Sequence, residues 1–94
     1  MKLTLKERIL RSCEGLSLEE LGKLLRTLVD LRAAISDIHR HSGLGLRKLS
    51  PRLWELRLGI SRRAVFALEK DEALFLFLGT HDEVRRFLRD FRQP

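Results

Sequence analysis

Apolar and polar residues follow two different periods along this chain of 94 residues. After Ser17, leucines and other apolar residues recur every three or four positions as far as Ile38. This spacing predicts a long amphipathic helix that ends near Arg40. Shorter segments after Thr4 and after Thr80 show the same spacing. The pattern therefore predicts three helices, the last of them short and close to the C-terminus.

Each predicted helix begins with a capping-box sequence, in which a hydroxyl caps free amides and a later glutamate reaches back. These sequences are Thr4-Leu-Lys-Glu7, Ser17-Leu-Glu-Glu20 and Thr80-His-Asp-Glu83. The first is ambiguous, because residues 2–5 also alternate and could form a short strand. The long helix has an alternative too, a division into a helical hairpin near Asp30. The residues 41–43, His-Ser-Gly, offer its stop signal.

Between the second and the last helix the period changes to two, which is typical of β-strands. Residues 53–58, 63–68 and 73–78 are predicted strands, and Trp54 falls on the face opposite to Glu55 and Arg57. The third strand is apolar on both sides, so both faces of the sheet should be covered, one by the long helix. The C-terminal helix or a second subunit would cover the other.

These elements predict an α+β fold in one domain over residues 1–94. We expect N-terminal helices packed on a small antiparallel β-meander, followed by a short C-terminal helix.

The positive charge is concentrated in one segment. Of the formal net charge of +6, residues 1–39 contribute +1, residues 40–63 contribute +6 and residues 64–94 contribute −1. Arginine supplies six of the seven basic residues in the middle segment. Its guanidinium binds phosphate through two parallel hydrogen bonds and stacks on bases. The segment therefore indicates a polyanionic partner such as nucleic acid, with a solvated basic surface as the alternative.

Several other classes of protein are disfavoured. The longest apolar run, residues 73–78, is far shorter than the ~20 residues that cross a bilayer. The single Cys13 forms no internal disulfide, and His39 and His41 lack further metal ligands nearby. Residues 16–25 resemble the start of a helix-turn-helix but lack its turn glycine. We expect a cytoplasmic protein without membrane contact, metal or cofactor.

Four segments in chain order resemble motifs of the RelE/ParE toxin superfamily. They are Arg47-Lys-Leu49, Leu53-Trp-Glu-Leu-Arg57, Arg62-Arg-Ala-Val-Phe66 and Leu78-Gly-Thr-His-Asp-Glu-Val84. The resemblance implies the toxin of a toxin–antitoxin pair, with an antitoxin protein, the ribosome and mRNA as partners. It also implies a homodimer or a toxin–antitoxin hetero-oligomer. RelE-like members cut mRNA in the ribosomal A site, whereas ParE-like members inhibit DNA gyrase and cut no RNA.

The resemblance also implies roles for individual residues. Arg63 would stabilise the phosphorane, with Arg62 as the alternative in register; Arg57 would position phosphate, and His81 would transfer a proton. We expect further RNA contacts from five residues, which are Arg47, Lys48, Arg52, Arg62 and Arg85.

Two features of the sequence bear on the catalytic interpretation. Many ribonucleases of the superfamily carry a tyrosine after the last strand, but this chain contains no tyrosine. Phe87 can stack but cannot exchange a proton, and its helical spacing favours a place in the core. His81 could be only an exposed turn residue. We expect Arg47, Lys48, Arg57 and one of Arg62 or Arg63 to lie on one open face of the sheet and its adjoining loop, and to converge within a concave site.

Overall fold

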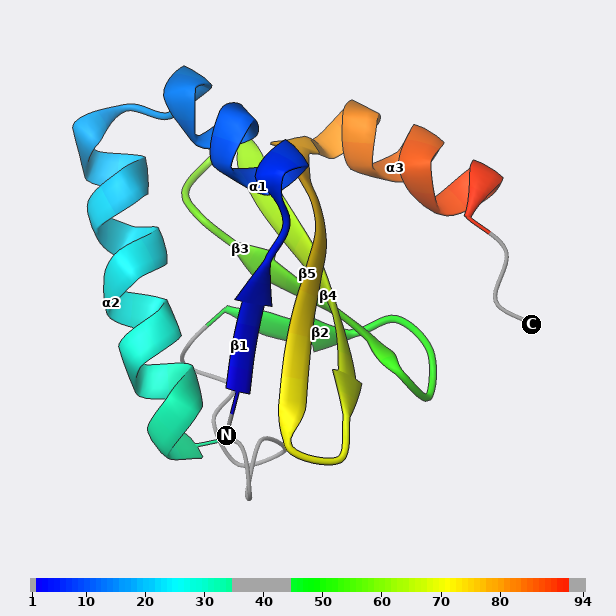
Figure 1. Ribbon diagram of the computed structural model, residues 1–94. Coiled ribbons are helices and arrows are strands. Elements are labelled where there is room, and N and C mark those ends of the chain that lie inside the picture. The colour runs from blue at the N-terminus through cyan, green and yellow to red at the C-terminus, as the bar shows by residue number, and fades with distance from the viewer. Residues whose placement is uncertain (1, 35–44, 92–94) are drawn as a thin grey trace.

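A computed structural model describes residues 2–34 and 45–91 (Figure 1). In chain order its elements are β1 (Lys2–Leu5), α1 (Glu7–Ser12), the 3-10 turn η1 (Cys13–Gly15), α2 (Leu18–Ala34), β2 (Leu46–Lys48), β3 (Leu53–Arg57), β4 (Arg62–Glu69), β5 (Glu72–Thr80) and α3 (His81–Asp90). The strands form one sheet in the order β1-β5-β4-β3-β2. The α+β fold class is confirmed, and the meander of β3, β4 and β5 is antiparallel as expected.

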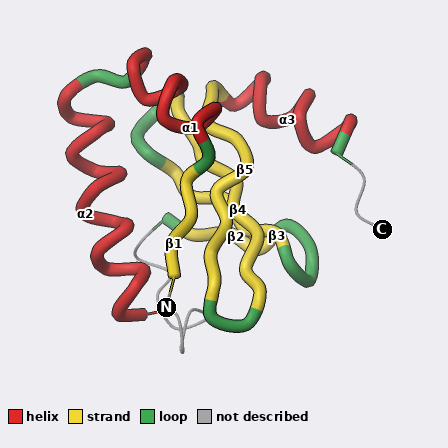
Figure 2. Tube along the Cα trace, in the orientation of Figure 1, coloured by secondary structure: helices red, strands yellow, loops and turns green. Residues whose placement is uncertain are grey.

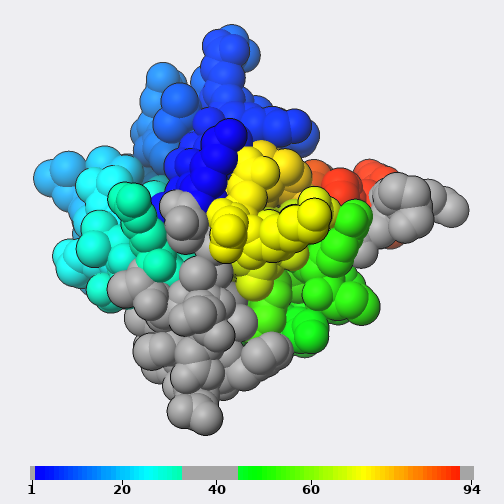
Figure 3. Space-filling view, turned by 60° about the horizontal axis from the view of Figure 1, so that its bottom comes forward, coloured from blue at the N-terminus to red at the C-terminus, as the bar shows by residue number. Residues whose placement is uncertain are grey.

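The helices cover the sheet from two sides. Figures 1 and 2 show α2 along one side of the sheet, α1 over one end and α3 extending away from the end of β5. In the space-filling view of Figure 3, the yellow β4–β5 hairpin lies between α2 in cyan and part of α3 in red. The strands therefore have a helix to pack against on each face.

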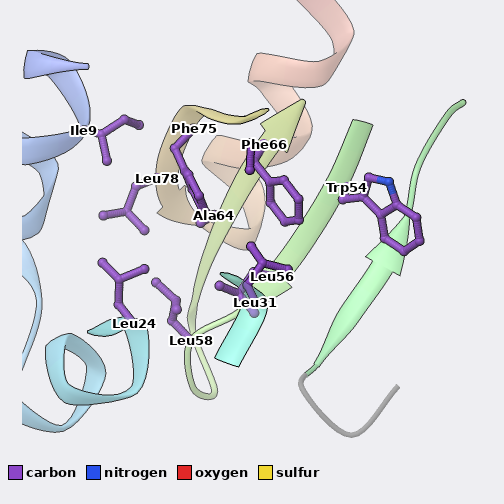
Figure 4. Packing of buried hydrophobic residues seen from close by; sticks show 11 residues of the cluster. Ile9, Leu24, Leu31, Trp54, Leu56, Leu58, Ala64, Phe66, Phe75 and Leu78 are labelled. Atoms are coloured by element: carbon purple, nitrogen blue, oxygen red, sulfur yellow. The ribbon is translucent and has the colours of Figure 1, made fainter. Parts of the chain in front are cut away.

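The larger core lies between the sheet and the first two helices (Figure 4). Trp54, Phe66 and Phe75 lie on this face, and the rings of Phe66 and Phe75 stack with centroids 5.0 Å apart. Leu24 and Leu31 of α2 fill the opposite side of the same cluster. Alternate strand residues point to one face, so the period of two along β3 and β4 accounts for this layer.

A smaller core lies between the other face of the sheet and α3. Val65 of β4 is buried there against Val84 of α3. Phe87 stacks between Phe77 and Phe91, with centroid distances of 4.7 and 5.3 Å. The prediction that both faces of the third strand are covered is confirmed, and so is the interpretation of Phe87 as a core-facing residue.

Two of the three predicted capping boxes are present. Glu20 N–H donates to Ser17 Oγ at 3.1 Å, and Glu83 N–H donates to Thr80 Oγ1 at 3.2 Å. In both boxes the glutamate carboxylate accepts the reciprocal backbone hydrogen bond. Of the two alternatives for residues 2–5, the strand is the one present, because Thr4 belongs to β1 and its hydroxyl donates to Glu72 Oε2 at 2.6 Å.

Residues 2–5 form a strand and not a helix cap because the strand gains backbone hydrogen bonds to β5. Residues 2–5 pair in parallel with residues 72–75 of β5, and Leu3 and Leu5 pack against the larger core. A single capping hydrogen bond contributes about 1 kcal/mol, which is less than a paired and half-buried strand. Helix α1 starts after Lys6 instead, without a side-chain cap.

Two further elements differ from the sequence expectations. Helix α2 continues through Asp30 to Ala34, so the hairpin alternative at that position is wrong. The predicted helix end near Arg40, the stop at 41–43, and His39 and His41 lie outside the described residues. Strand β2 has three residues, which is too short to show a period. It therefore adds an edge to the sheet that the alternation pattern could not indicate.

Helix α2 offers a direct test of the packing. Leu31 is fully buried, whereas Leu25 on the same helix is 55% exposed. We expect Leu31→Ala to lower the free energy of unfolding by about 2–5 kcal/mol, and Leu25→Ala by less than about 1 kcal/mol. Urea titrations followed by the fluorescence of the buried Trp54 measure both changes. Equal losses from the two variants would show that α2 packs through a different face.

Candidate nucleic-acid interface

Three arginines and one glutamate gather on the face of the sheet that α3 covers only in part. Arg57 of β3 lies directly opposite Arg63 of β4, and Arg47 of β2 lies opposite Glu55 of β3. Residues opposite each other on antiparallel strands project to the same face, as do residues two apart on one strand. Arg47, Glu55, Arg57 and Arg63 therefore share one face, and we name them the arginine corner.

The corner stays open because the apolar part of this face ends beside it. Helix α3 packs over β5 and β4, where Val65 and Phe77 are opposite each other. One row further along the strands, Gly79 and Arg63 take their places. In that row the charged side chain of Arg63 occupies a position where the core would need an apolar side chain. The boundary between the smaller core and the corner therefore follows from the alternation of β3 and β4.

Arg63 is the most enclosed cation of the corner. Its Nη1 lies 2.8 Å from Glu55 Oε1, and the two side chains are only 15% and 9% exposed. The Nε–H group of Arg63 is buried and has no hydrogen-bond acceptor among the described residues. An ion pair this short and this enclosed holds the guanidinium in one place. Glu55 also neutralises part of the charge, and Arg47 and Arg57 remain exposed.

Gly45 lies directly before β2 and contacts the backbone of Arg57. The backbone N–H of Arg57 donates to Gly45 O at 3.1 Å. A Cβ atom at Gly45 would come 3.5 Å from the Cβ of Arg57, and the φ of Gly45 is +77°, where L-residues are strained. The glycine thus lets the chain turn into β2 next to Arg57. That turn brings Arg47 onto the same face.

His81 lies at the end of β5, where α3 begins. It is the first residue of α3, is exposed, and its side chain makes no hydrogen bond or ion pair with another described residue. The cap is made by Thr80, which pairs with Arg62 of β4. Arg85 follows one helical turn later and is also exposed. His81 is thus a free imidazole at the end of the sheet where Arg63 also lies.

The remaining predicted RNA contacts lie elsewhere. Lys48 is opposite Trp54 on the other face, with its Nζ 5.9 Å from the ring centroid. Arg62 also lies on that face, and its Nη2 donates to the carbonyl of Gly15 at 3.5 Å. Arg52, at the far end of β3, forms a 2.6 Å ion pair with Glu69.

The expectation of a shared open face therefore holds for three residues of the four. Arg47 and Arg57 share the open face with Arg63, whereas Arg62 lies on the other face. Which of Arg62 and Arg63 contacts the phosphate stays a prediction. The expectation is wrong for Lys48, because neighbouring residues of a strand point to opposite faces.

Glu55 is the residue of the site that the sequence analysis did not select. It is 7% exposed, which is unusual for a carboxylate, and its partner is the central arginine of the corner. A signal was present in the sequence. Glu55 is the single acidic residue of the basic segment 40–63, and it alternates with Arg57 on the same strand face.

Two other kinds of feature are absent from the described ranges 2–34 and 45–91. No three His, Cys, Asp or Glu side chains gather there in a way that could hold a metal ion. Within the same residues, no helix has the length and apolar character required to cross a membrane.

The five-stranded sheet with α1 and α2 on one face and α3 on the other is the fold of the RelE-like toxins. Escherichia coli RelE, solved as a mutant in complex with a peptide of the antitoxin RelB, matches with a TM-score of 0.64 at 17% identity, over 99% of this chain and 96% of that chain. A copper-bound mutant toxin from Helicobacter pylori matches with a TM-score of 0.52 at 20% identity, over 89% of this chain and 98% of that chain.

A conserved hypothetical protein from Helicobacter pylori, solved in solution, matches with a TM-score of 0.53 at 20% identity, over 89% of this chain and 98% of that chain. No protein-family model matches the sequence. No curated protein sequence matches it either. The resemblance seen in the four sequence segments is thus confirmed at the level of the fold.

The cap that precedes His81 predicts a pH dependence of stability. Hydrogen bonds with Thr80 lower the pKa of Glu83 below its ordinary value of 4.5. The backbone N–H of Thr80 has the largest effect, and its hydroxyl has the next largest. A lowered pKa in the folded state means that the carboxylate stabilises the fold fully above pH 4.5, and that this contribution is lost as the pH falls through the lowered pKa. We expect Glu83→Gln to be less stable than the wild type at pH 7, with the difference shrinking on acidification.

Urea titrations between pH 7 and pH 3 measure this difference. Asp82→Asn is the matched control, because it removes a carboxylate from the same first turn without touching the capping box. Identical pH dependence in the wild type and Glu83→Gln would mean that the box does not form in solution.

Proposed function

We propose that this protein is the toxin of a toxin–antitoxin pair, and that it cleaves mRNA on the ribosome in the cytoplasm. The observation that carries the proposal is the pairing of Arg57 with Arg63 on the open face of the sheet, with Arg47 beside them. The RelE-like fold supports it, since one of the similar structures is a toxin bound to an antitoxin peptide.

Cleavage of RNA through its own 2′-hydroxyl needs compensation for charge that develops on phosphorus. A base must take the proton of the 2′-hydroxyl, and an acid must protonate the departing 5′-oxygen. In this proposal Arg63 stabilises the phosphorane and Arg57 orients the phosphate. Arg63 suits its part because its ion pair with Glu55 fixes the guanidinium before RNA binds. Arg47, exposed on the neighbouring edge strand, binds the RNA backbone.

His81 is the proton-transfer group of the proposal. It is exposed at the start of α3, its position is set by the capping box of Thr80, and no hydrogen bond to another described residue occupies its imidazole. Because the chain has no tyrosine, the proton cannot pass through a phenol. Arg85, one turn further on the same side of α3, contributes a second cation for RNA.

The proposed antitoxin binds through an acidic and apolar segment. Acidic side chains complement the arginine corner, and apolar side chains would take the places of Val84 and Phe87 on the smaller core where the segment displaces α3. Such a segment would block the same surface that RNA needs. Co-expression with the gene next to this one should therefore give a complex of the two proteins in which the toxin is inactive.

A second function has one observation in its favour. Without a tyrosine, and with Glu55 offsetting part of the charge on Arg63, the corner could bind a target and perform no chemistry. Inhibition of DNA gyrase, as in ParE-like toxins, is that alternative.

Single substitutions test the two catalytic roles of the proposal. We expect Arg63→Ala and His81→Ala each to lower the rate of mRNA cleavage on programmed ribosomes by about 10²-fold or more. His81→Ala should leave stability unchanged, because Thr80 and not His81 caps the helix. Arg89→Ala is the control, since Arg89 is an exposed arginine of α3 outside the proposed site.

The measurement is primer extension on mRNA from a translating extract, together with growth of cells that express each variant. Full activity of His81→Ala alongside loss in Arg63→Ala would remove the histidine from the mechanism. Growth arrest by the wild type with unbroken mRNA would select the gyrase inhibitor.

A further inference from the structure

A second cationic feature lies where the β3–β4 turn meets α2. A hollow of about 450 Å³ is lined by Lys23 of α2, Arg57, Arg63, and Gly59 and Ile60 of the turn. Its three charged lining residues are all cations. Two of them belong to the arginine corner, so the hollow extends the corner around the end of the sheet to α2. Figure 1 shows this turn beside the first half of α2.

The turn is built to meet the helix closely. Leu58 N–H donates to Arg62 O at 2.9 Å and closes the hairpin. Gly59 has φ +148°, and a Cβ atom added there would come 3.7 Å from Cγ of Glu20. The turn therefore packs against the first turns of α2, and Lys23, one turn beyond Glu20, reaches the rim of the hollow. The ammonium group of Lys23 makes no ion pair with another described residue.

The acidic residues of this region lie on the other side of the turn. Glu19 and Glu20 line a neighbouring hollow of about 330 Å³ together with Lys23 and Arg26. Glu20 is held there by its capping box, since its carboxylate accepts from Ser17 N–H at 2.9 Å. The side of the turn that faces the arginine corner is therefore positive, whereas the side that faces the start of α2 is mixed.

Ile60 at the apex of the turn is fully exposed, at 101% of its reference area. On the side of the turn that faces the arginine corner, this exposed isoleucine lies beside three cations. An apolar group beside cations matches a surface that is both apolar and anionic. A nucleotide is such a surface, because its sugar and base are largely apolar on their faces and its phosphate is charged.

We propose that this hollow binds the RNA strand next to the cleaved linkage. Lys23 contacts a backbone phosphate adjacent to the one held by Arg57 and Arg63, and Ile60 packs against the sugar or base between them. The inference rests on the proposed function and adds to it a positioning residue, Lys23, which lies on a helix and not on a strand. It also predicts that RNA approaches the corner from the side of α2.

The test compares Lys23→Gln and Ile60→Ser with the wild type, with Lys70→Gln as the control. Lys70 is an exposed lysine in the β4–β5 turn, at the other end of the sheet, so it undergoes the same change of charge. The probe is a fluorescent RNA of ten nucleotides carrying 2′-O-methyl groups, which cannot be cleaved. Binding is measured by anisotropy over a range of salt concentrations, and mRNA cleavage is measured in a translating extract.

We expect Lys23→Gln to weaken RNA binding about 5- to 10-fold and to reduce the slope of log K against log salt by about 0.7, the value for one phosphate contact on a single strand. Ile60→Ser should weaken binding without changing the slope, because no charge is removed. Both variants should cleave mRNA more slowly, and Lys70→Gln should match the wild type in both measurements.

The other outcomes distinguish the two proposals. If the wild type cleaves mRNA while Lys23→Gln binds and cleaves as the wild type does, the subsite is wrong and the proposed function stands. If the wild type neither binds RNA nor cleaves mRNA, both are wrong. If polyglutamate binds in a Lys23-dependent manner and RNA does not, the hollow accepts an acidic protein segment and the subsite proposal is overturned.

Discussion

The ion pair between Arg63 and Glu55 is the interaction on which the open face of the sheet depends. On this face of β4, Arg63 lies next to the apolar side chains, one row from the fully buried Val65. An enclosed guanidinium without a counter-charge would lose several kcal/mol of hydration, so it would turn outward or the strand would shift. Glu55, two residues before Arg57 on the adjacent strand, supplies that counter-charge at 2.8 Å. The pair thus allows a cation to stand at the margin of a core.

That constraint also explains why arginines can collect at this corner of the face, beside the smaller core. Helix α3 has ten residues, and its apolar side chains cover the part of the face formed by β5 and β4. Strand β3 changes from Leu53, in the smaller core, to Glu55 and then Arg57 along the same face. The exposed end of this row meets the β3–β4 turn. The corner and the hollow beside it are therefore one continuous basic surface that passes from the sheet to α2.

The sequence indicates local features well and long-range pairings poorly. Period two located β3, β4 and β5, and the boxes at Ser17 and Thr80 marked the starts of α2 and α3, because each signal lies within a few residues. For Thr4 the local patterns favoured strand and cap alike, and the partner that decides for the strand, Glu72, is 68 residues away. Lys48 was placed with Arg47 from the resemblance, whereas the face of a strand side chain depends on register, and neighbouring residues point to opposite faces. Glu55 was missed for the same reason, since its role as the partner of Arg63 depends on which strand lies beside β3.

The end of β5 is where the two functional alternatives separate. Gly79 pairs with Arg63, and a Cβ atom at Gly79 would come 2.9 Å from Glu83 Oε1, inside any normal contact distance. The glycine is therefore required for the capping box, and the box makes α3 begin at His81, two residues after the partner of Arg63. The capping that stabilises the last helix thus also places an unoccupied imidazole at the end of the sheet that carries the cations. Arginines alone can hold and neutralise a phosphate, which is enough for binding, but strand cleavage also needs a proton to move. In our proposal His81 moves that proton in a chain without tyrosine, so the ribonuclease and the binding protein of the same fold would differ at this histidine.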